Sequence, residues 1–384
     1  MASSTSRKAR CFNLCSTPKG FSRLGARGIA NACYGMVRLR FEPATVSMRL
    51  LGTEAIPRLG EFKAQGLANT AWAFATLGMP DPQLFDAIAR KSKQRIGEFE
   101  PQGLANTAWA NASLGISDPQ LFDAIARKSE QHIGSFNPQG LANTAWAFAT
   151  LGTPAPQLFD AIARESEQRI GNFNPQDLAN TVWAFATLGM PAPQLYKAIA
   201  RESQQRIGSF NEQDLANTAW AFATLGTPAP QLFEAIARKS QQRIDSFNEQ
   251  GLANTAWAFA TFGTSAPQLF EAIVRESEQQ IGSFKPQELA NTAWAFVIVG
   301  TADQGALVEA VSARAAEMGQ AAFYGGGRSQ LHQFFLGVEL EACPPTELLA
   351  PIGLWDVCRQ AMANEKPART SKLHKEVSRK CQAS

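Results

Sequence analysis

The amino-acid sequence predicts an all-α fold: a right-handed α-solenoid of tandem 37-residue helix-turn-helix repeats. A phrase close to LANTAWAFATLG recurs with a constant spacing of 37 residues, and a fixed period of this size is typical of stacked-repeat proteins. Each copy holds two helical stretches separated by Gly and Pro, and two such helices cannot bury their apolar faces without neighbouring copies. The seven copies begin at Leu67, Leu104, Leu141, Leu178, Leu215, Leu252 and Leu289.

The copy around residue 141 shows how the first helix of a repeat should form. Asn137 is a favourable N-cap, and Pro138 suits the first helical position because no backbone N–H is needed there. Phe136 precedes the cap and can pack on the first turn as a hydrophobic staple. We expect this helix to run to about Leu151, with Gly152 as its left-handed stop.

The second helix of the same copy should begin at Pro156, after the turn that starts at Pro154, and should end near Ile170 with Gly171 as its stop. Its apolar residues form a narrow stripe, so we expect it to form the solvent-facing layer. Its outward side chains should be Asp160, Arg164, Glu167 and Gln168.

The first helix has a broad apolar arc, which indicates that it is sandwiched between neighbouring repeats. The arc comprises Leu141, Ala142, Ala145, Trp146, Phe148 and Ala149. The remaining face carries Gln139, Asn143 and Thr150, so it is polar but uncharged. We expect a second row to flank it, formed by Thr70, Thr107, Thr144, Thr181, Thr218, Thr255 and Thr292.

Stacking the repeats would place seven asparagines in one row along this face. Their amides could contact the edges of bases in single-stranded RNA, because helical repeats can bind one base per unit. The alternative is a structural ladder of amides between neighbouring repeats, and the sequence leaves both interpretations open. The row comprises Asn69, Asn106, Asn143, Asn180, Asn217, Asn254 and Asn291.

Two further sets of side chains are candidates for RNA contact. The residue before the recurring Leu is Gly in four copies and is Asp177, Asp214 or Glu288 in the others, so it could discriminate between bases. The alternative is helix-start chemistry, which accepts the same residues. Arginines recur on the second helix and could contact phosphates, or could form ion pairs on a solvated face: Arg90, Arg127, Arg164, Arg201, Arg238 and Arg275.

The recurring tryptophans could stack on bases, but we expect them to pack between repeats; they are Trp72, Trp109, Trp146, Trp183, Trp220, Trp257 and Trp294. One copy departs from the pattern. Asn111 replaces the core Phe, and Ser113 replaces a Thr. A buried amide without partners would cost roughly 1–3 kcal/mol, which predicts that the second repeat is the least stable.

Composition divides the chain into five parts. Residues 1–23 form a basic leader without acidic residues, which is typical of a transit peptide, with a plain basic tail or the start of the fold as the alternative. Residues 24–66 contain a degenerate repeat, in which GIANACYGMVRL matches GLANTAWAFATL. Residues 67–300 hold seven repeats, the last partial, followed by capping helices over 301–350 and a basic tail over 351–384. The leader predicts a nucleus-encoded protein of the mitochondrion (matrix) or plastid.

Charge and cysteine content narrow the classes of function. Residues 1–66 carry 11 basic and 3 acidic side chains, whereas residues 67–288 carry a net charge of −5, which argues against strong non-specific phosphate binding by the array. The six cysteines form no metal-binding pattern and are expected to be reduced thiols. No apolar run is long enough for a membrane span.

Motifs for catalysis are missing from the sequence. The stretch Gly325–Arg328 lacks the Lys-Ser/Thr pair of a phosphate loop, and His132, His332 and His374 share no pattern with other candidate residues. We therefore predict no enzyme activity, no cofactor and no small-molecule substrate.

The phrase LANTAWAFATLG with its 37-residue period resembles the heptatricopeptide and octotricopeptide repeats of organellar RNA-binding proteins, and the helical repeats of the FAST-kinase-domain family. The resemblance covers residues 28–300. The segments SQLHQFFLGVEL (329–340) and ARTSKLHKEVSRK (368–380) are similar to the helices that lead into a RAP domain, although the residues of that domain do not follow. The resemblance implies binding of single-stranded organellar RNA, affecting its stability, processing or translation, with ribonucleoprotein partners.

Three hypotheses result for the function of the chain. The first is a sequence-selective RNA-binding solenoid, which the uncharged amide face and the family resemblance favour. The second is a protein–protein interaction scaffold, which the negative charge of the array favours. The third is a folded paralogue that has lost its ligand.

Overall fold

The computed structural model describes residues 21, 23–39, 44–300, 305–323, 327–328, 330–331 and 333–335. All regular elements in these ranges are α-helices or short 3-10 helices, and none is a strand. The expected transit peptide, the basic tail, and the histidines 332 and 374 lie outside the described residues.

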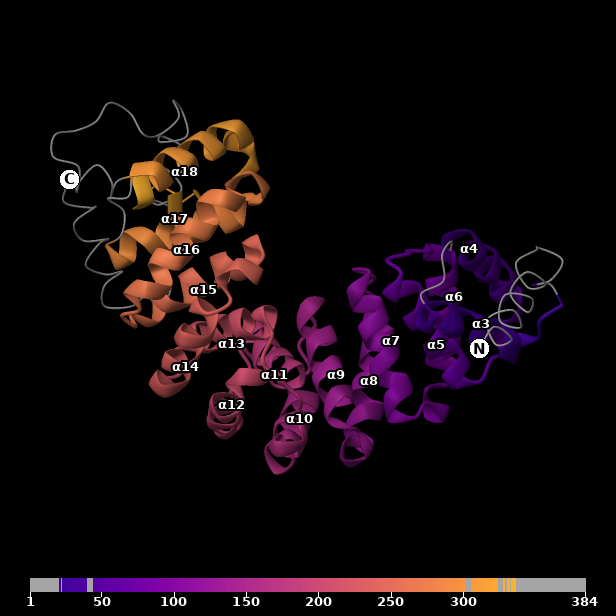
Figure 1. Cartoon of the computed structure of the whole chain (residues 1–384). Coiled ribbons are helices and arrows are strands. Elements are labelled where there is room, and N and C mark those ends of the chain that lie inside the picture. Colours follow the sequence, from indigo (N-terminus) through magenta and orange to yellow (C-terminus); the bar gives the residue numbers. More distant parts are fainter. Residues whose placement is uncertain are drawn as a thin grey trace, which may run out of the picture. The chain divides into compact units, whose positions relative to one another are not determined.

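The chain divides into two compact units, Met1–Leu195 and Tyr196–Ser384, and the division falls inside α12 (Pro193–Gln205). In each unit a first helix (A helix) alternates along the chain with a second helix (B helix), as Figure 1 shows. The A helices of the first unit are α3 (Ala26–Arg38), α5 (Ala64–Thr76), α7 (Pro101–Ser113), α9 (Pro138–Thr150) and α11 (Pro175–Leu188). Its B helices are α4 (Ala44–Ala55), α6 (Pro82–Gln94), α8 (Pro119–Gln131) and α10 (Pro156–Gln168).

The second unit repeats this alternation. Its A helices are α13 (Glu212–Leu225), α15 (Glu249–Phe262) and α17 (Pro286–Val299), and its B helices are α14 (Pro230–Gln241), α16 (Pro267–Gln280) and α18 (Gly305–Met318). Most B helices are followed by a 3-10 turn, for example η4 (Ile170–Asn172) after α10.

Consecutive repeats pack helix against like helix within each unit. In the first unit α5 packs on α7, α7 on α9 and α9 on α11, while α6, α8 and α10 form a second layer; α13, α15 and α17 stack in the same way in the second unit. Alanines without exposed surface, such as Ala108 and Ala145, lie on these helices and allow their close approach. This arrangement confirms the predicted all-α solenoid.

The start and stop signals of the A helix act as predicted. The Asn137 side chain accepts a hydrogen bond from the Gly140 N–H at 2.7 Å, and Pro138 is the first residue of α9. Gly152 follows the helix with φ +60°, a left-handed conformation that favours glycine.

The B helix ends earlier than predicted. α10 stops at Gln168, and Gly171 lies inside the 3-10 turn η4 without a positive φ. Arg169 follows the helix in a non-helical conformation (φ −123°), and its Nη1 donates to the Phe136 carbonyl oxygen at 2.8 Å. His132 takes the same conformation after α8 without such a bond, so the helix end does not depend on this contact. The bond ties the end of the B helix to the start of the A helix in the same repeat.

This bond recurs, and we call it the repeat clasp. Arg95 donates in the same way to the Phe62 carbonyl oxygen, Arg243 donates to Phe210 at 3.1 Å, and Gln280 donates to Phe247 at 3.1 Å. The second repeat differs, since His132 at the equivalent position pairs with Lys128 at 2.8 Å and has no bond to the Phe99 carbonyl in the described structure. The second repeat therefore lacks the clasp as well as the core Phe.

Further helices lie on both sides of the seven-copy phrase. α3 and α4 form a two-helix unit, and Arg58 donates to the Leu24 carbonyl oxygen as a clasp would. At the other end α18 packs on α16 and α17 and Arg314 donates to the Phe284 carbonyl oxygen at 3.4 Å, so α18 acts as the B helix of the seventh repeat.

Candidate functional site

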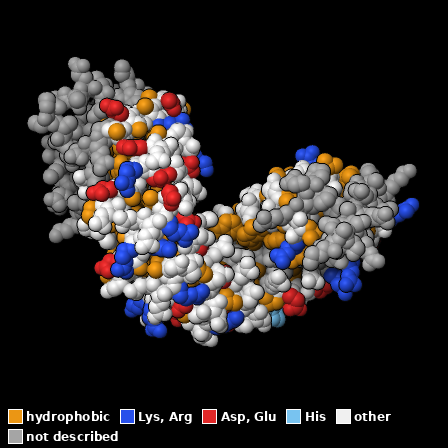
Figure 2. Space-filling view, in the orientation of Figure 1, with side chains coloured by type: hydrophobic (Ala, Val, Ile, Leu, Met, Phe, Trp, Pro, Cys, Tyr) orange, Lys and Arg blue, Asp and Glu red, His pale blue; other side chains and the backbone are white. Residues whose placement is uncertain are grey.

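The A helices from α5 to α15 each leave one side uncovered, and we call this side the amide–indole face. On α9 it consists of Gln139, Asn143, Trp146 and Thr150, which are spaced so that they lie along one line of the helix. The other sides of α9 are covered by the neighbouring A helices α7 and α11 and by α10. Figure 2 shows hydrophobic side chains exposed in a band over the A helices of the first unit.

The asparagines of this face are half-buried, and most have no partner within the protein. Six of the seven make no hydrogen bond to any other described residue. A structural ladder would need amide-to-amide or amide-to-backbone bonds between repeats, and these six side chains form neither. Their donors and acceptors are available to solvent or to a ligand: Asn69, Asn106, Asn143, Asn180, Asn217 and Asn254.

The seventh asparagine is different. The Asn291 Oδ1 accepts from Gln287 Nε2 at 2.8 Å and from Gln330 Nε2 at 2.9 Å. Gln330 comes from a later segment of the chain and has a longer side chain than Asn. An amide bridge between neighbouring helices therefore occurs at this end of the row.

The tryptophans pack between repeats as predicted, but most of them also keep part of the ring at the surface. The Trp257 ring contacts the rings of Trp220 and Trp294 at centroid distances of 6.3 and 6.5 Å, so consecutive copies meet. Six of the seven indoles are half-buried, and only Trp294 is fully buried, at 4% exposure. The half-buried set is Trp72, Trp109, Trp146, Trp183, Trp220 and Trp257.

The prediction that a threonine row flanks the asparagines is wrong, because these threonines are buried. Thr70, Thr107 and Thr144 each donate to the carbonyl oxygen of the glycine four residues earlier, at 2.7–2.8 Å. They belong to the contact between A helices and are not accessible to a ligand.

The acidic residues at the mouth of the A helices take part in capping. Asp177 is 4% exposed, and its carboxylate accepts from the Asn174 N–H at 3.1 Å while Asn174 accepts from the Asp177 N–H at 2.8 Å. Asp214 forms the same capping box with Asn211, and Glu288 accepts from the Lys285 N–H at 2.8 Å. The helix-start alternative explains all three acids, and their role in base discrimination remains a prediction.

Burial and capping oppose each other at Asp177. Burial raises the pKa of this carboxyl above its usual value, and the hydrogen bond from the Asn174 backbone lowers the pKa by less. In the other copies this position is Gly. A Cβ atom added to Gly140, for example, would lie only 3.2 Å from Cδ1 of Phe136. Little room therefore exists at this position for variation that a ligand could sense.

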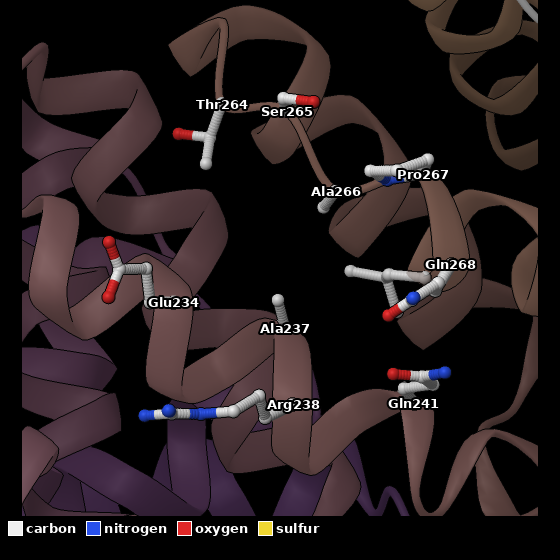
Figure 3. A pocket seen from close by; sticks show the side chains of 10 residues that line it. Glu234, Ala237, Arg238, Gln241, Thr264, Ser265, Ala266, Pro267 and Gln268 are labelled. Carbon is white, nitrogen blue, oxygen red and sulfur yellow. The ribbon is translucent and has the colours of Figure 1, made fainter.

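The arginine row lies on the B helices, in the other layer from the asparagines. All six arginines are exposed, and none forms an ion pair with another described residue. In the second unit, a pocket of about 260 Å³ lies between α14, with Glu234 and Arg238, and the loop Thr264–Ala266 together with the first residues of α16, Pro267 and Gln268 (Figure 3). A pocket of about 200 Å³ lies one repeat earlier, with Arg201 in the equivalent place.

The structure therefore does not bring the two predicted contact rows together. The amide–indole face carries no charged residue, whereas Lys, Arg, Asp and Glu side chains are mixed over the surface of the second unit (Figure 2). A polar pocket of about 290 Å³ also lies at the N-terminal ends of α13 and α15, beside Gln213 of this face.

Other site chemistry was sought among the same residues. Within the described ranges no group of three His, Cys, Asp or Glu side chains is arranged to hold a metal ion. No described helix is both long enough and apolar enough to cross a membrane.

A comparison with known protein families assigns the repeat array to a family. The family model of the RNA-editing substrate-binding complex 6 protein matches residues 31–153 and residues 130–322, which together span most of the chain. The chain belongs to this family. Membership agrees with the expected RNA-associated helical-repeat protein, while the specific heptatricopeptide, octotricopeptide and FAST-kinase-domain assignments remain predictions.

Two further comparisons add little to this family assignment. No curated protein matches the chain. Among solved structures, a homology model of the full-length AP-3 complex in an intermediate open conformation is 11% identical, covering 91% of this chain and 67% of that chain, with a TM-score of 0.28. A similarity this low has no bearing on fold or function.

Proposed function

We propose that this protein is a non-catalytic, sequence-selective single-stranded RNA-binding module that acts in organellar RNA metabolism: RNA editing or other processing, stability or translation. The row of half-exposed asparagine amides without intramolecular partners carries the proposal. Such amides can donate to and accept from base edges, which is how helical repeats recognise single-stranded RNA. The family's name, which refers to an RNA-editing substrate-binding complex, supports the same class of ligand.

The electrostatics of the face favour recognition of bases over phosphates. Its Gln, Asn, Trp and Thr side chains are uncharged, so few counterions would be released from the RNA on binding. We therefore expect the affinity to depend only weakly on salt. A steep dependence would instead indicate binding by a basic segment, such as residues 1–23.

The test is fluorescence anisotropy of the full chain with short labelled RNAs, about twelve nucleotides long to cover one base per repeat, at two salt concentrations. Asn143→Ala combined with Asn180→Ala should weaken binding by about tenfold or more, because two base contacts are lost. Asn172→Ala is the matched control, since this exposed asparagine lies on η4, away from the face. Equal loss in both variants, or no RNA binding by the wild type, would refute the proposal.

A protein-binding scaffold is the second candidate. The exposed arginines and the pockets beside Arg201 and Arg238 recur with the repeat period on the B-helix layer, together with acidic side chains such as Glu234, which suits a protein partner that carries side chains of both charges. This surface is separate from the amide–indole face, so one protein could hold both partners. Localisation in the mitochondrion or plastid is part of our proposal and follows from the basic leader.

A further inference from the structure

The half-buried tryptophans are the largest apolar groups on the amide–indole face. The indoles contact one another between repeats and still keep part of their surface exposed, and apolar rows that remain exposed mark binding surfaces. The pattern also includes the degenerate first repeat, where Tyr34 is 39% exposed and its ring lies 5.3 Å from that of Trp72. The aromatic row of the first unit therefore begins at Tyr34.

Each indole lies next to an asparagine amide. Asn143 and Trp146 are three residues apart on α9, so their side chains are neighbours on one helix face, and the same spacing holds in every copy. An indole offers a flat apolar surface to a base, and the adjacent amide offers a donor and an acceptor to the edge of that base. This pairing is the combination used to bind single-stranded nucleic acids through their bases.

The rings leave part of their faces open to solvent. Trp220 and Trp257 meet at 6.3 Å with an interplanar angle of 34°, and Trp257 and Trp294 meet at 6.5 Å and 35°. These distances are near the upper limit for paired aromatic rings, so neighbouring indoles touch without covering each other.

The last position of the row is closed by the chain itself. The Trp294 Nε1–H donates to the Gln333 Oε1 at 2.6 Å, and the Asn291 amide accepts from Gln330. Gly327 contacts Ala290 in the same way as Gly103 contacts Ala68 in an earlier pair of A helices. In both cases a Cβ atom added to the glycine would lie 3.8 Å from the Cβ atom of the alanine. The segment from Gly327 therefore occupies the place of a next A helix, with Gln330 and Gln333 at the asparagine and tryptophan positions.

We propose that the half-buried tryptophans of each unit, Trp72 to Trp183 in the first and Trp220 and Trp257 in the second, are stacking platforms for RNA bases, one base per repeat, and that the Asn291–Trp294 position is closed by Gln330 and Gln333 and takes no base. The inference rests on the proposed RNA-binding function and deepens it. The ligand class is an unpaired nucleobase in a single strand, bound through its ring and its edge more than through its phosphate. Because the Trp294 position takes no base, Trp257 would hold the last base bound by the second unit.

The experiment compares ordinary RNA with an oligonucleotide of the same length that lacks bases, using the full chain. We expect RNA to quench the indole fluorescence and the abasic strand to bind much more weakly. Trp146→Leu should weaken RNA binding about 5- to 150-fold, the loss of stacking for one base, and should leave the weak abasic binding within about twofold. Trp294→Phe should change RNA affinity by less than about twofold, since this position takes no base.

The outcomes separate the two proposals. RNA that binds as tightly as the abasic strand and leaves the indole fluorescence unchanged would overturn base stacking while leaving RNA binding intact. No binding of any strand would overturn both. A Trp294→Phe variant that loses as much affinity as Trp146→Leu would overturn the closed position. Circular dichroism melting of each variant shows whether it is folded, and the fluorescence of the wild type tests stacking even if a variant does not fold.

Discussion

Replacing Asn111 with phenylalanine should stabilise the second repeat. Asn111 lies on α7 with 1% of its surface exposed. Its Nδ2 donates to the Thr107 carbonyl oxygen at 2.8 Å, but its Oδ1 has no hydrogen-bond partner in the described structure. The equivalent residues of the two neighbouring A helices are Phe74 and Phe148, both buried at 1% exposure.

The size of the effect follows from the neighbouring repeats. Phe122 and Phe148 form an edge-to-face pair at 4.9 Å, and the equivalent pair in the second repeat would join Phe85 to residue 111. Removing an unpaired buried oxygen gains roughly 1–3 kcal/mol, and an aromatic pair adds roughly 0.5–1.5 kcal/mol beyond burial. Burying the phenylalanine ring gains roughly 1.5–3 kcal/mol. If the site is too small for the ring, the resulting strain costs roughly 1–3 kcal/mol. We expect a net gain of about 2–4 kcal/mol in the local free energy of unfolding.

Native-state hydrogen exchange is the suitable assay, because repeat arrays do not always unfold as one cooperative unit. In the wild type the amides of α7 should exchange faster than those of α5 and α9. In the Asn111→Phe variant the exchange of α7 should slow by about 30-fold or more, the equivalent of 2 kcal/mol. Phe148→Asn should produce the reverse change in α9, and Ser113→Thr should have little effect because Ser113 is exposed.

Two results would refute this reasoning. Wild-type α7 could prove as protected as α9, which would mean that the buried amide is satisfied in a way that these contacts do not show. Alternatively, Asn111→Phe could speed the exchange of α7, which would mean that the second repeat has closed around the smaller side chain.

Four further predictions concern single contacts. Arg169→Ala should remove the clasp to the Phe136 carbonyl and lower the free energy of unfolding by roughly 1–3 kcal/mol in urea denaturation, with no change as the contradicting result. His132→Arg should supply the missing clasp and raise that free energy by about 1 kcal/mol; a decrease would show that the clasp is not general. Burial raises the pKa of Asp177 from 3.8, so its ionised form is disfavoured in the folded chain. Asp177→Asn should therefore be more stable than wild type at neutral pH, and the difference should shrink as the pH falls through the folded-state pKa towards 3.8; a pH-independent difference would contradict this. Arg164→Gln, on the B-helix layer, should change RNA affinity by less than about twofold in anisotropy, and a tenfold loss would restore the phosphate-contact hypothesis.

The helical signals near each boundary could be predicted because they act over a few residues. Asn137 caps α9 and Gly152 ends it as expected, since both depend only on the local backbone. The end of α10 was predicted too late, because Gly171 was expected to be a left-handed stop and instead lies within the 3-10 turn η4. Arg169 also donates to a carbonyl 33 residues earlier, and no local pattern reports such a contact.

The candidate site was also only partly predictable. The uncharged stripe through Asn143 follows from helical periodicity, because an apolar arc on three sides leaves a polar fourth side. The placement of Trp146 does not follow, since its size and apolar character make burial the default expectation.

The sequence by itself determined the period, the two-helix unit, the caps and the uncharged face, because each depends on residue types at short, regular spacing. Only the tertiary structure decided which apolar residues remain exposed, which asparagines lack partners, and where the row is closed. Those properties depend on what the neighbouring repeats cover. Trp257 and Trp294 stand in nearly identical sequence surroundings, yet one is half-exposed and the other is covered by Gln333. The difference lies in the helix that packs next to each, about forty residues further along the chain.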